Sequence, residues 1–219
     1  MTQKATILVV ATKNRGKSEE IRGFLKDFPL EVRDLNDFGP IPDVSEDGQT
    51  FEENAYKKAS FTARVLGFPA LADDSGLQVE ALGGAPGVRS ARYAGENAND
   101  EANNAKLLQE MAGASDRRAH FTCVLSLAVP TGPALTYEAA CEGIITEHPK
   151  GSNGFGYDPL FFYPPTGKTF GEMTIEEKSR VSHRGRALQE LQQELDKVMA
   201  WLEKRIDEEK ISRGDFECC

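Results

Sequence analysis

The sequence has 219 residues, of which 39% are hydrophobic and 28% are charged, a composition that suits one substantial globular domain. The formal net charge of −9 argues against a nucleic-acid partner, because phosphate backbones attract basic surfaces and repel acidic ones. The longest apolar runs, such as residues 121–130, are strand-length and interrupted, so we expect no membrane span, and the N-terminus lacks the pattern of a signal peptide.

The first part of the chain alternates between strand-like and helix-like segments. Residues 7–11 form a short apolar run that predicts a buried strand, and the apolar side chains of residues 16–26 have helical spacing. Thr50 and Glu53 have the spacing of a capping box, which predicts a helix that runs to Leu66 and stops at Gly67. Residues 70–72 and 77–81 are predicted to be extended, on either side of two adjacent aspartates.

The second part of the chain contains the longest strand-like segments. A predicted helix over residues 100–111 is followed by residues 120–129 and 135–146, which we expect to pair as antiparallel strands, and by a short strand over residues 160–162. A second capping box opens at Thr174, and a final helix is predicted over residues 185–207. The alternation predicts an α/β fold, with a single domain over residues 1–205 and a polar, disordered tail over residues 206–219.

The four cysteines indicate a reducing compartment. Cys123 and Cys141 lie inside apolar, strand-like runs, where a buried free thiol is expected, and Cys218 and Cys219 close the polar tail. The four have no metal-ligand spacing. We therefore expect a cytoplasmic protein.

A cluster of cations lies between the first predicted strand and the first predicted helix. Its sequence, ATKNRGKS over residues 11–18, predicts a phosphate site, because free N–H groups at a helix N-terminus favour an anion; an exposed basic turn is the alternative. The end of the segment also resembles the P-loop of an ATPase or kinase, with residues 71–73 as a Walker B strand. Residues 12–15 contain no glycine, which disfavours this alternative because the backbone must wrap closely around phosphates.

Two carboxylates stand side by side at Asp73 and Asp74, before Ser75 and a glycine. Adjacent side chains of a strand point to opposite faces, so one carboxylate is expected to face a cleft while the other supports it. Carboxylate oxygens suit Mg²⁺, which could bridge the protein to phosphates; a simple turn is the alternative. Glu46, in a further acidic loop, becomes a candidate ligand only if the fold brings it to the metal.

Aromatic side chains alternate with glycines over residues 151–159. Glycine loses much backbone freedom on ordering, so an ordered loop of this kind predicts a function. Phe155 could stack on a base, and Asp158 could accept hydrogen bonds from a ring nitrogen. A tight turn with its aromatic side chains in the core is the alternative.

A last group of donors consists of Lys178, His183 and Arg184. These side chains could donate to phosphate or to a carbonyl oxygen on a base. A lone histidine near a helix end is more often structural, but the neighbouring cations favour binding. Gly185 suggests a break between two helices here.

In this order and spacing, the four clusters resemble the inosine triphosphate pyrophosphatase family, in its bacterial branch, over about residues 7–191. The segments that carry the resemblance are residues 11–17, 48–59, 72–77, 83–95, 154–161 and 177–187. The resemblance implies an elongated α/β fold in two lobes, with a central mixed sheet flanked by helices, a substrate cleft between the lobes, and a homodimer. It also implies Mg²⁺-dependent hydrolysis of ITP, XTP and their deoxy forms to the monophosphate and pyrophosphate.

The resemblance also implies roles for individual residues. Asp74 would be the catalytic carboxylate and a magnesium ligand, with Glu46 as a second metal carboxylate. The substrate-binding residues would be Thr12, Lys13, Asn14, Arg15, Gly16, Lys17, Ser75, Phe155, Gly156, Tyr157, Asp158, Lys178, His183 and Arg184. The chain departs from the family at Lys13, where glycine is common, so its phosphate loop has less backbone freedom. A non-catalytic nucleotide sensor is a third hypothesis, which the paired aspartates beside a serine disfavour.

Overall fold

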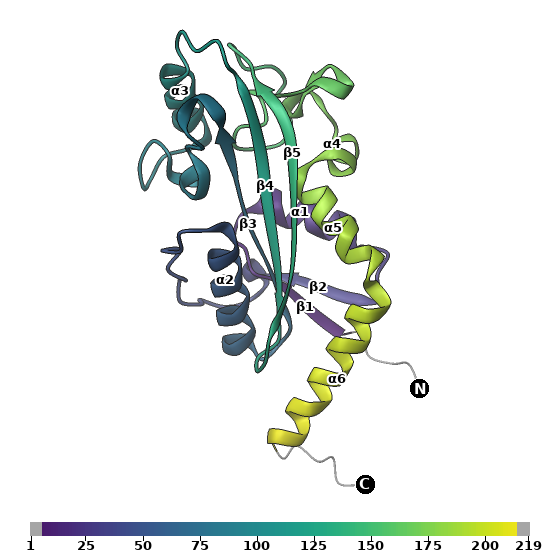
Figure 1. The fold of residues 1–219 in the computed structure, drawn as a ribbon. Coiled ribbons are helices and arrows are strands. Elements are labelled where there is room, and N and C mark those ends of the chain that lie inside the picture. Colours follow the sequence, from purple (N-terminus) through teal and green to yellow (C-terminus); the bar gives the residue numbers. More distant parts are fainter. Residues whose placement is uncertain (1–5, 214–219) are drawn as a thin grey trace.

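A computed structural model describes residues 6–213 of the chain, with a seven-stranded sheet at its centre (Figure 1). The strands lie in the order β2-β1-β3-β4-β5-β6-β7. Their bounds are β1 Thr6–Val10, β2 Leu30–Asp34, β3 Ala70–Val79, β4 Arg118–Ala128, β5 Ala134–Ile145, β6 Phe161–Tyr163 and β7 Lys168–Thr169. The strand β1 pairs in parallel with β2 and β3, and all later pairs are antiparallel, so the sheet is mixed as predicted.

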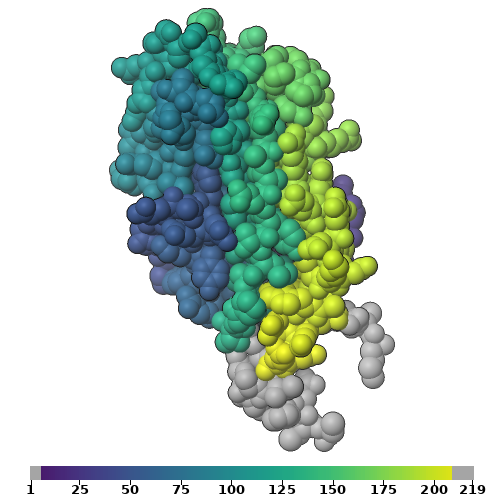
Figure 2. Space-filling view, viewed as in Figure 1, coloured from purple at the N-terminus to yellow at the C-terminus, as the bar shows by residue number. Residues whose placement is uncertain are grey.

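Six α-helices surround the sheet in the described residues. They are α1 Arg15–Leu25, α2 Phe51–Leu66, α3 Asp100–Glu110, α4 Ile175–Val181, α5 His183–Gln193 and α6 Leu195–Arg213. Figure 1 shows β3, β4 and β5 running along the length of an elongated molecule, with α2 and α3 on one side and α5 and α6 on the other. In Figure 2 the teal-green surface of β4 and β5 separates the blue α2 side from the yellow helices.

Three apolar clusters divide the core. One sheet face packs against α1, α5 and α6 around Leu125 and Leu127, and the other face packs alanines against alanines of α2. The third cluster gathers Phe121, Phe161 and Phe170 with Met111 at the end of α3. The small residues between α2 and β3 allow a close approach, which brings the polar side chains of that helix near the middle of the strand.

The local signals for helix ends are confirmed. The Thr50 side chain accepts from the Glu53 N–H at the start of α2, and the helix ends at Gly67, whose φ of 74° is left-handed. The predicted capping box is only half formed there, because the Glu53 side chain accepts from the Gln49 N–H. Thr174 and Glu177 form a complete capping box at the start of α4. Ser182 ends α4 and caps α5, so the break suggested by Gly185 lies just before it. A Cβ at Gly185 would lie 1.8 Å from the Ser179 carbonyl oxygen, so only glycine allows the two helices to meet this closely.

Other elements differ from the prediction. The two extended pieces around the aspartates are one continuous strand, β3, because β4 pairs with it along its whole length. The short strands β2 and β7 were not predicted. The single helix expected over residues 185–207 is two helices, α5 and α6, and α6 extends to Arg213 through residues that were assigned to a disordered tail. Cys218 and Cys219 lie outside the described residues.

None of the helices within residues 6–213 is both long enough and apolar enough to cross a membrane. The cysteines Cys123 and Cys141 are buried free thiols, as expected.

Candidate active site

The phosphate loop connects β1 to α1 and brings one of its cations, Lys17, to β3. The Thr12 hydroxyl accepts from the Asn14 N–H at 3.1 Å, and the Asn14 side chain caps α1 by accepting from the Lys17 N–H at 3.0 Å. The Lys17 ammonium lies in the first turn of the helix, 2.6 Å from an oxygen of Asp73. Thr12, Lys13, Asn14 and Lys17 line a cavity of about 300 Å³.

Two loop residues of the predicted set lie outside this cavity. Arg15 is exposed and does not belong to the lining, and Gly16 packs against the ring of Phe155 instead. A Cβ on Gly16 would lie 2.4 Å from the Phe155 ring, so glycine is needed here for the contact with the aromatic side chain. The structure therefore gives Gly16 a packing contact with the predicted base-binding residue.

Asp73 and Asp74 point to opposite faces of β3, as the alternation predicted. Asp74 lines the 300 Å³ cavity together with Glu46 and Lys58. Its Oδ1 lies 2.6 Å from the Lys58 ammonium, and its Oδ2 accepts from the Asn54 amide at 3.4 Å. Burial raises the pKa of Asp74, and the charges of Lys58 and Lys17 oppose that rise only in part.

Lys58 was not predicted, although α2 carries a signal for it. The residue is buried on the same helix face as Ala55, Ala59 and Thr62, where a lysine is unusual unless it is paired. Burial works to lower the pKa of Lys58, but the charges of Asp74 and Glu46 outweigh it and raise the pKa. Lys58 therefore stays charged beside the candidate catalytic carboxylate.

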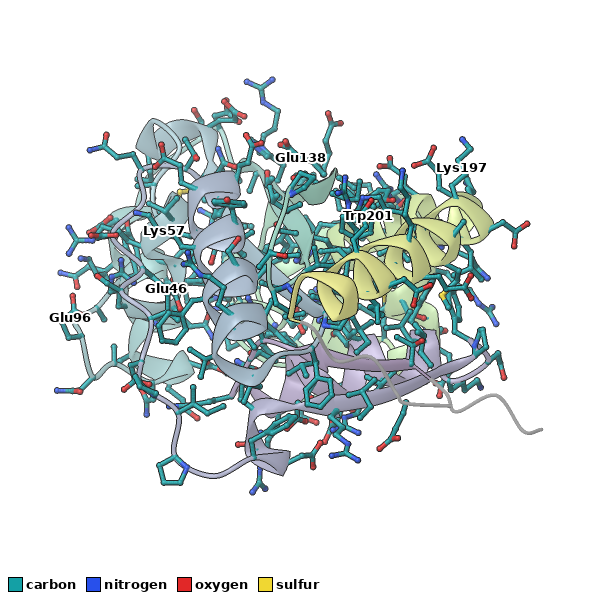
Figure 3. The ribbon with its side chains drawn as sticks, turned by 90° about the horizontal axis from the view of Figure 1, so that it is seen from below. Glu46, Lys57, Glu96, Glu138, Lys197 and Trp201 are labelled. Atoms are coloured by element: carbon teal, nitrogen blue, oxygen red, sulfur yellow. The ribbon has the colours of Figure 1, made fainter. Side chains whose placement is uncertain are left out.

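Glu46 approaches this group from the loop that precedes α2. Its Oε2 lies 3.5 Å from the Lys58 ammonium, and its carbonyl oxygen accepts from Arg92 at 3.1 Å. Figure 3 shows Glu46 on this loop, close to the side of α2 that also carries Lys57. The fold thus brings Glu46 into the same cavity as Asp74, the condition for it to serve as a second metal carboxylate.

The donor set fits a magnesium ion that keeps most of its own waters. No group of three or more His, Cys, Asp or Glu side chains gathers as a metal site among the described residues. Mg²⁺ in a nucleotide site commonly needs only one or two carboxylates, because substrate phosphates and water complete its shell. Asp74 and Glu46 supply two such carboxylates in one cavity.

Asp73 belongs to a buried ion network on the other face of the strand. Its oxygens accept from Arg184 Nε at 2.7 Å and from Lys17 at 2.6 Å, and the Cys123 thiol donates to it at 3.1 Å. Burial pushes the pKa of Asp73 upward, but the charges of Arg184 and Lys17 outweigh it and hold the pKa well below its usual range. Asp73 is therefore the supporting carboxylate of the pair.

Glu20 completes the network and was missed by the prediction. Its carboxylate lies 2.5 Å from Arg184 Nη1 and 2.8 Å from the Lys178 ammonium, which in turn lies 2.5 Å from Asp158. Burial pushes the pKa of Glu20 upward, and Arg184 and Lys178 outweigh it and lower the pKa. A charged residue beside Ile21 on the buried side of α1 was the available signal.

A second cavity, of about 110 Å³, lies next to this network. It is lined by most of the predicted nucleotide residues: Asn14, Lys17, Ser75, Phe155, Gly156, Tyr157, Asp158, Lys178, His183 and Arg184. The ring of Phe155 lies beneath the Lys178 ammonium, 4.7 Å from its centroid. Tyr157 is buried and donates its hydroxyl to the Ser90 carbonyl at 2.8 Å, which anchors the loop in the core.

His183 lines this cavity and has a buried nitrogen with no hydrogen-bond partner among the described residues. Its ring stacks on Phe121 at 4.6 Å between centroids, and its Nδ1 is buried without a partner among the described residues. Burial, followed by the charges of Arg184 and Lys178, holds the pKa of His183 well below its usual range, so the imidazole is neutral at pH 7. The Arg184 guanidinium, in contrast, already donates to Asp73, Glu20 and Ser75.

Known proteins resemble this chain over most of its length. The profile of the Ham1 family matches residues 8–194. The dITP/XTP pyrophosphatase of Syntrophobacter fumaroxidans is 69% identical over 208 residues, covering 95% of this chain and 90% of that protein, and that of Desulfotalea psychrophila is 56% identical over 209 residues, covering 95% and 94%.

Solved structures of similar sequence have the same fold. The Ham1 protein of Staphylococcus aureus superposes with a TM-score of 0.78 at 42% identity, covering 87% of this chain and 98% of that one. A HAM1 protein from Coxiella burnetii superposes with a TM-score of 0.80 at 42% identity, covering 88% and 99%. The family resemblance and the mixed α/β fold inferred from the sequence are therefore confirmed, and the chain belongs to the Ham1 family.

Proposed function

We propose that this protein hydrolyses non-standard purine nucleoside triphosphates, dITP/ITP and dXTP/XTP, to the nucleoside monophosphate and pyrophosphate, and so clears them from the nucleotide pool. The observation that carries the proposal is one strand, β3, whose Asp74 lies in an open cavity. Its neighbour Asp73, at the edge of the same cavity, pairs with Arg184 and Lys17, which line a second, smaller cavity. A triphosphate fits the first cavity and a base the second. The names of the relatives, dITP/XTP pyrophosphatases, support this substrate class.

In the proposed mechanism, the triphosphate lies along the phosphate loop against Lys17 and the N-terminus of α1. Asp74 accepts a proton from the attacking water as the oxygen forms its bond to the α-phosphorus. Pyrophosphate then leaves, and Lys17 stabilises its developing charge. Lys58 holds Asp74 in place and favours its ionised form, which is the form that can accept the proton.

Asp74 and Glu46 are the residues that would hold Mg²⁺ in this proposal. The ion would neutralise the phosphate charge and help to orient water. We further propose that the protein acts as a cytoplasmic homodimer, in line with the family resemblance.

Base selection is assigned to the second cavity. Hypoxanthine and xanthine carry an oxygen at position 6, where adenine carries an amino group. In the tautomer that presents an N–H to the base, neutral His183 would pair with the oxygen. The same tautomer would set its donor against the adenine amino group, which costs about 1–3 kcal/mol when buried. Guanine shares the 6-oxo group, so its exclusion depends on its 2-amino group and the shape of the cavity.

The P-loop alternative needs Ser18 as a magnesium ligand, and the structure disfavours it. The Ser18 hydroxyl is buried and donates to Asp34, on the side of α1 away from the triphosphate cavity. The α1 helix also begins at Arg15, directly after its cap at Asn14, so the segment contains no wide loop around a phosphate.

Product analysis tests the proposal. The protein is incubated with ITP, XTP, GTP or ATP and Mg²⁺, and the products are separated. Pyrophosphate with IMP or XMP, and nearly unchanged GTP and ATP, is the expected result. Orthophosphate with ADP would favour the P-loop ATPase, and binding of ITP without any turnover would favour a nucleotide sensor.

A further inference from the structure

One residue of the glycine-rich loop, Gly156, is held by α3 through both of its backbone polar groups. Its N–H donates to the Asp100 carboxylate at 2.6 Å, and its carbonyl accepts from the Asn104 amide at 2.9 Å. Asp100 and Asn104 are four residues apart, so their side chains lie on the same face of the helix. The φ of Gly156 is 62°, a left-handed conformation that glycine adopts without strain.

These two bonds act on the segment that carries Phe155. On the other side of that residue, the Asn153 N–H donates to the Gly171 carbonyl and the Asn153 amide donates to the Met173 carbonyl. The Phe155 N–H itself donates to Asp158 at 2.9 Å. The backbone around Phe155 is thus fixed from two sides of the molecule, by α3 through Gly156 and by the segment before α4 through Asn153.

The side chain of Asn104 has one polar atom that is hydrogen-bonded and one buried polar atom that is not. Its Nδ2 donates to Gly156, but its Oδ1 is buried without a partner among the described residues. Leaving a buried polar atom unpaired is unfavourable, so fold stability alone would favour an apolar side chain of the same length at this position. Stability therefore does not explain the asparagine, whereas its hydrogen bond to the Gly156 carbonyl does.

We propose that Asp100 and Asn104 are positioning residues for purine selection. They fix the two peptide groups that flank the Gly156 Cα, and through them the plane in which the Phe155 ring meets the base. This inference rests on the proposed function, because it assigns the base to the cavity that Phe155 lines. Asp100 also lines the base cavity, and neither residue lines the triphosphate cavity, so their contribution concerns the base end of the substrate.

Product inhibition separates the two ends of the substrate. IMP occupies the base cavity, whereas pyrophosphate occupies only the phosphate loop. In Asp100→Ala and Asn104→Leu, the inhibition constant for IMP should rise about three- to tenfold, the range for one lost hydrogen bond, while that for pyrophosphate stays unchanged. The KM for ITP should rise with the IMP constant, and kcat should change less.

Matched variants distinguish positioning from general damage. Asp100→Asn keeps an acceptor for the Gly156 N–H and should restore IMP inhibition, and Glu101→Ala removes an exposed charge from the same turn and should change nothing. The melting temperature of Asn104→Leu should stay close to that of the parent protein, because the lost hydrogen bond to Gly156 and the removal of the unpaired oxygen oppose each other.

The inference would be overturned if Asn104→Leu left IMP inhibition unchanged, or weakened pyrophosphate inhibition to the same degree. Failure of the parent protein to convert ITP to IMP and pyrophosphate would instead overturn the proposed function. The parent protein, assayed first, therefore keeps the two failures apart.

Discussion

The two faces of β3 use adjacent carboxylates in opposite ways. On one face, Asp73 is saturated by Arg184, Lys17, Ser75 and Cys123, and its pKa lies well below the usual range because the cations outweigh its burial. On the other, Asp74 has one close cation, Lys58, and its pKa is raised because burial outweighs that cation. A carboxylate with a depressed pKa and a carboxyl group with a raised pKa, our proposed proton acceptor, thus occupy neighbouring positions.

The difference extends to the surroundings of each residue. Around Asp73, the side chains of Arg184, Glu20, Lys178 and Asp158 are buried, and each is paired with another member of the network. Around Asp74, the Glu46 side chain is 43% exposed and only loosely paired. The paired network therefore holds the shape of the site, whereas the open face leaves charges available for the substrate and metal that we propose.

The largest effect is expected at the proton acceptor. Asp74→Asn should lower kcat about 10²- to 10⁴-fold, because an amide cannot accept the proton from water, while KM for ITP changes far less. Asp47→Asn, on the same loop system but exposed and paired with Lys57, is the control and should keep full activity. Near-normal turnover in Asp74→Asn would refute the assignment.

The next largest effect concerns stability. Asp73→Asn leaves the buried Arg184 and Lys17 without their carboxylate and should lower the free energy of unfolding by about 3–5 kcal/mol at neutral pH. The folded pKa of Asp73 is depressed, so its contribution is full above the ordinary value of 3.8 and is lost as the pH falls below it.

Denaturant unfolding from pH 7 to pH 2 measures this difference. The parent protein and Asp73→Asn should differ most at neutral pH and converge in acid. Asp116→Asn, in an exposed pair with Arg118, serves as the control, and a gap of constant size at every pH would contradict the depressed pKa of Asp73.

A smaller effect is expected from the lysine beside Asp74. Lys58→Met removes the cation that lowers the pKa of Asp74. The pKa of Asp74 should therefore rise further in this variant. Since only the ionised carboxylate accepts a proton, the acid limb of kcat/KM should move to higher pH. Lys57→Met, the exposed neighbour on α2, should leave the limb in place; a shift to lower pH in Lys58→Met would exclude Asp74 as the titrating base.

The smallest effect is expected at the mouth of the open cavity. Lys13 pairs at 2.5 Å with Asp43, and both side chains are mostly exposed, so neither Lys13→Gly nor Asp43→Asn should change the melting temperature measurably. Their effects on KM for ITP should be opposite in sign and about two- to threefold, because Asp43 competes with phosphate for Lys13, and both should fade in high salt. Changes of the same sign would indicate that the pair acts only as a structural contact.

The sequence predicted the fold where a signal was local. Thr50, Gly67 and Thr174 mark helix ends through their own side chains or backbone, and these bounds are confirmed. The strand β2 and the junction between α5 and α6 have no such marker, since pairing with β1 and packing on the sheet decide them. Neither the strand β2 nor the junction between α5 and α6 could therefore be located without the three-dimensional structure.

The site was predicted to the extent that its residues lie in compact motifs. Asp74, Lys17 and His183 stand in motifs with a chemical pattern, and the fold brings them together around adjoining cavities. Glu20 and Lys58 lie singly on helix faces, and each acquires its partners from segments distant in the sequence. A buried charge on an otherwise apolar face is the pattern that could have revealed them.

The close meeting of α4 and α5 at Gly185 has a consequence for sequence variants. Lys178 and Arg184 lie on different helices, yet both reach Glu20, and they do so because no side chain separates the helices at residue 185. Any side chain at residue 185 would push α4 and α5 apart, so that Lys178 and Arg184 could no longer both pair with Glu20. Such a variant would resemble a loss of base recognition, although the altered residue lines neither cavity and touches no substrate.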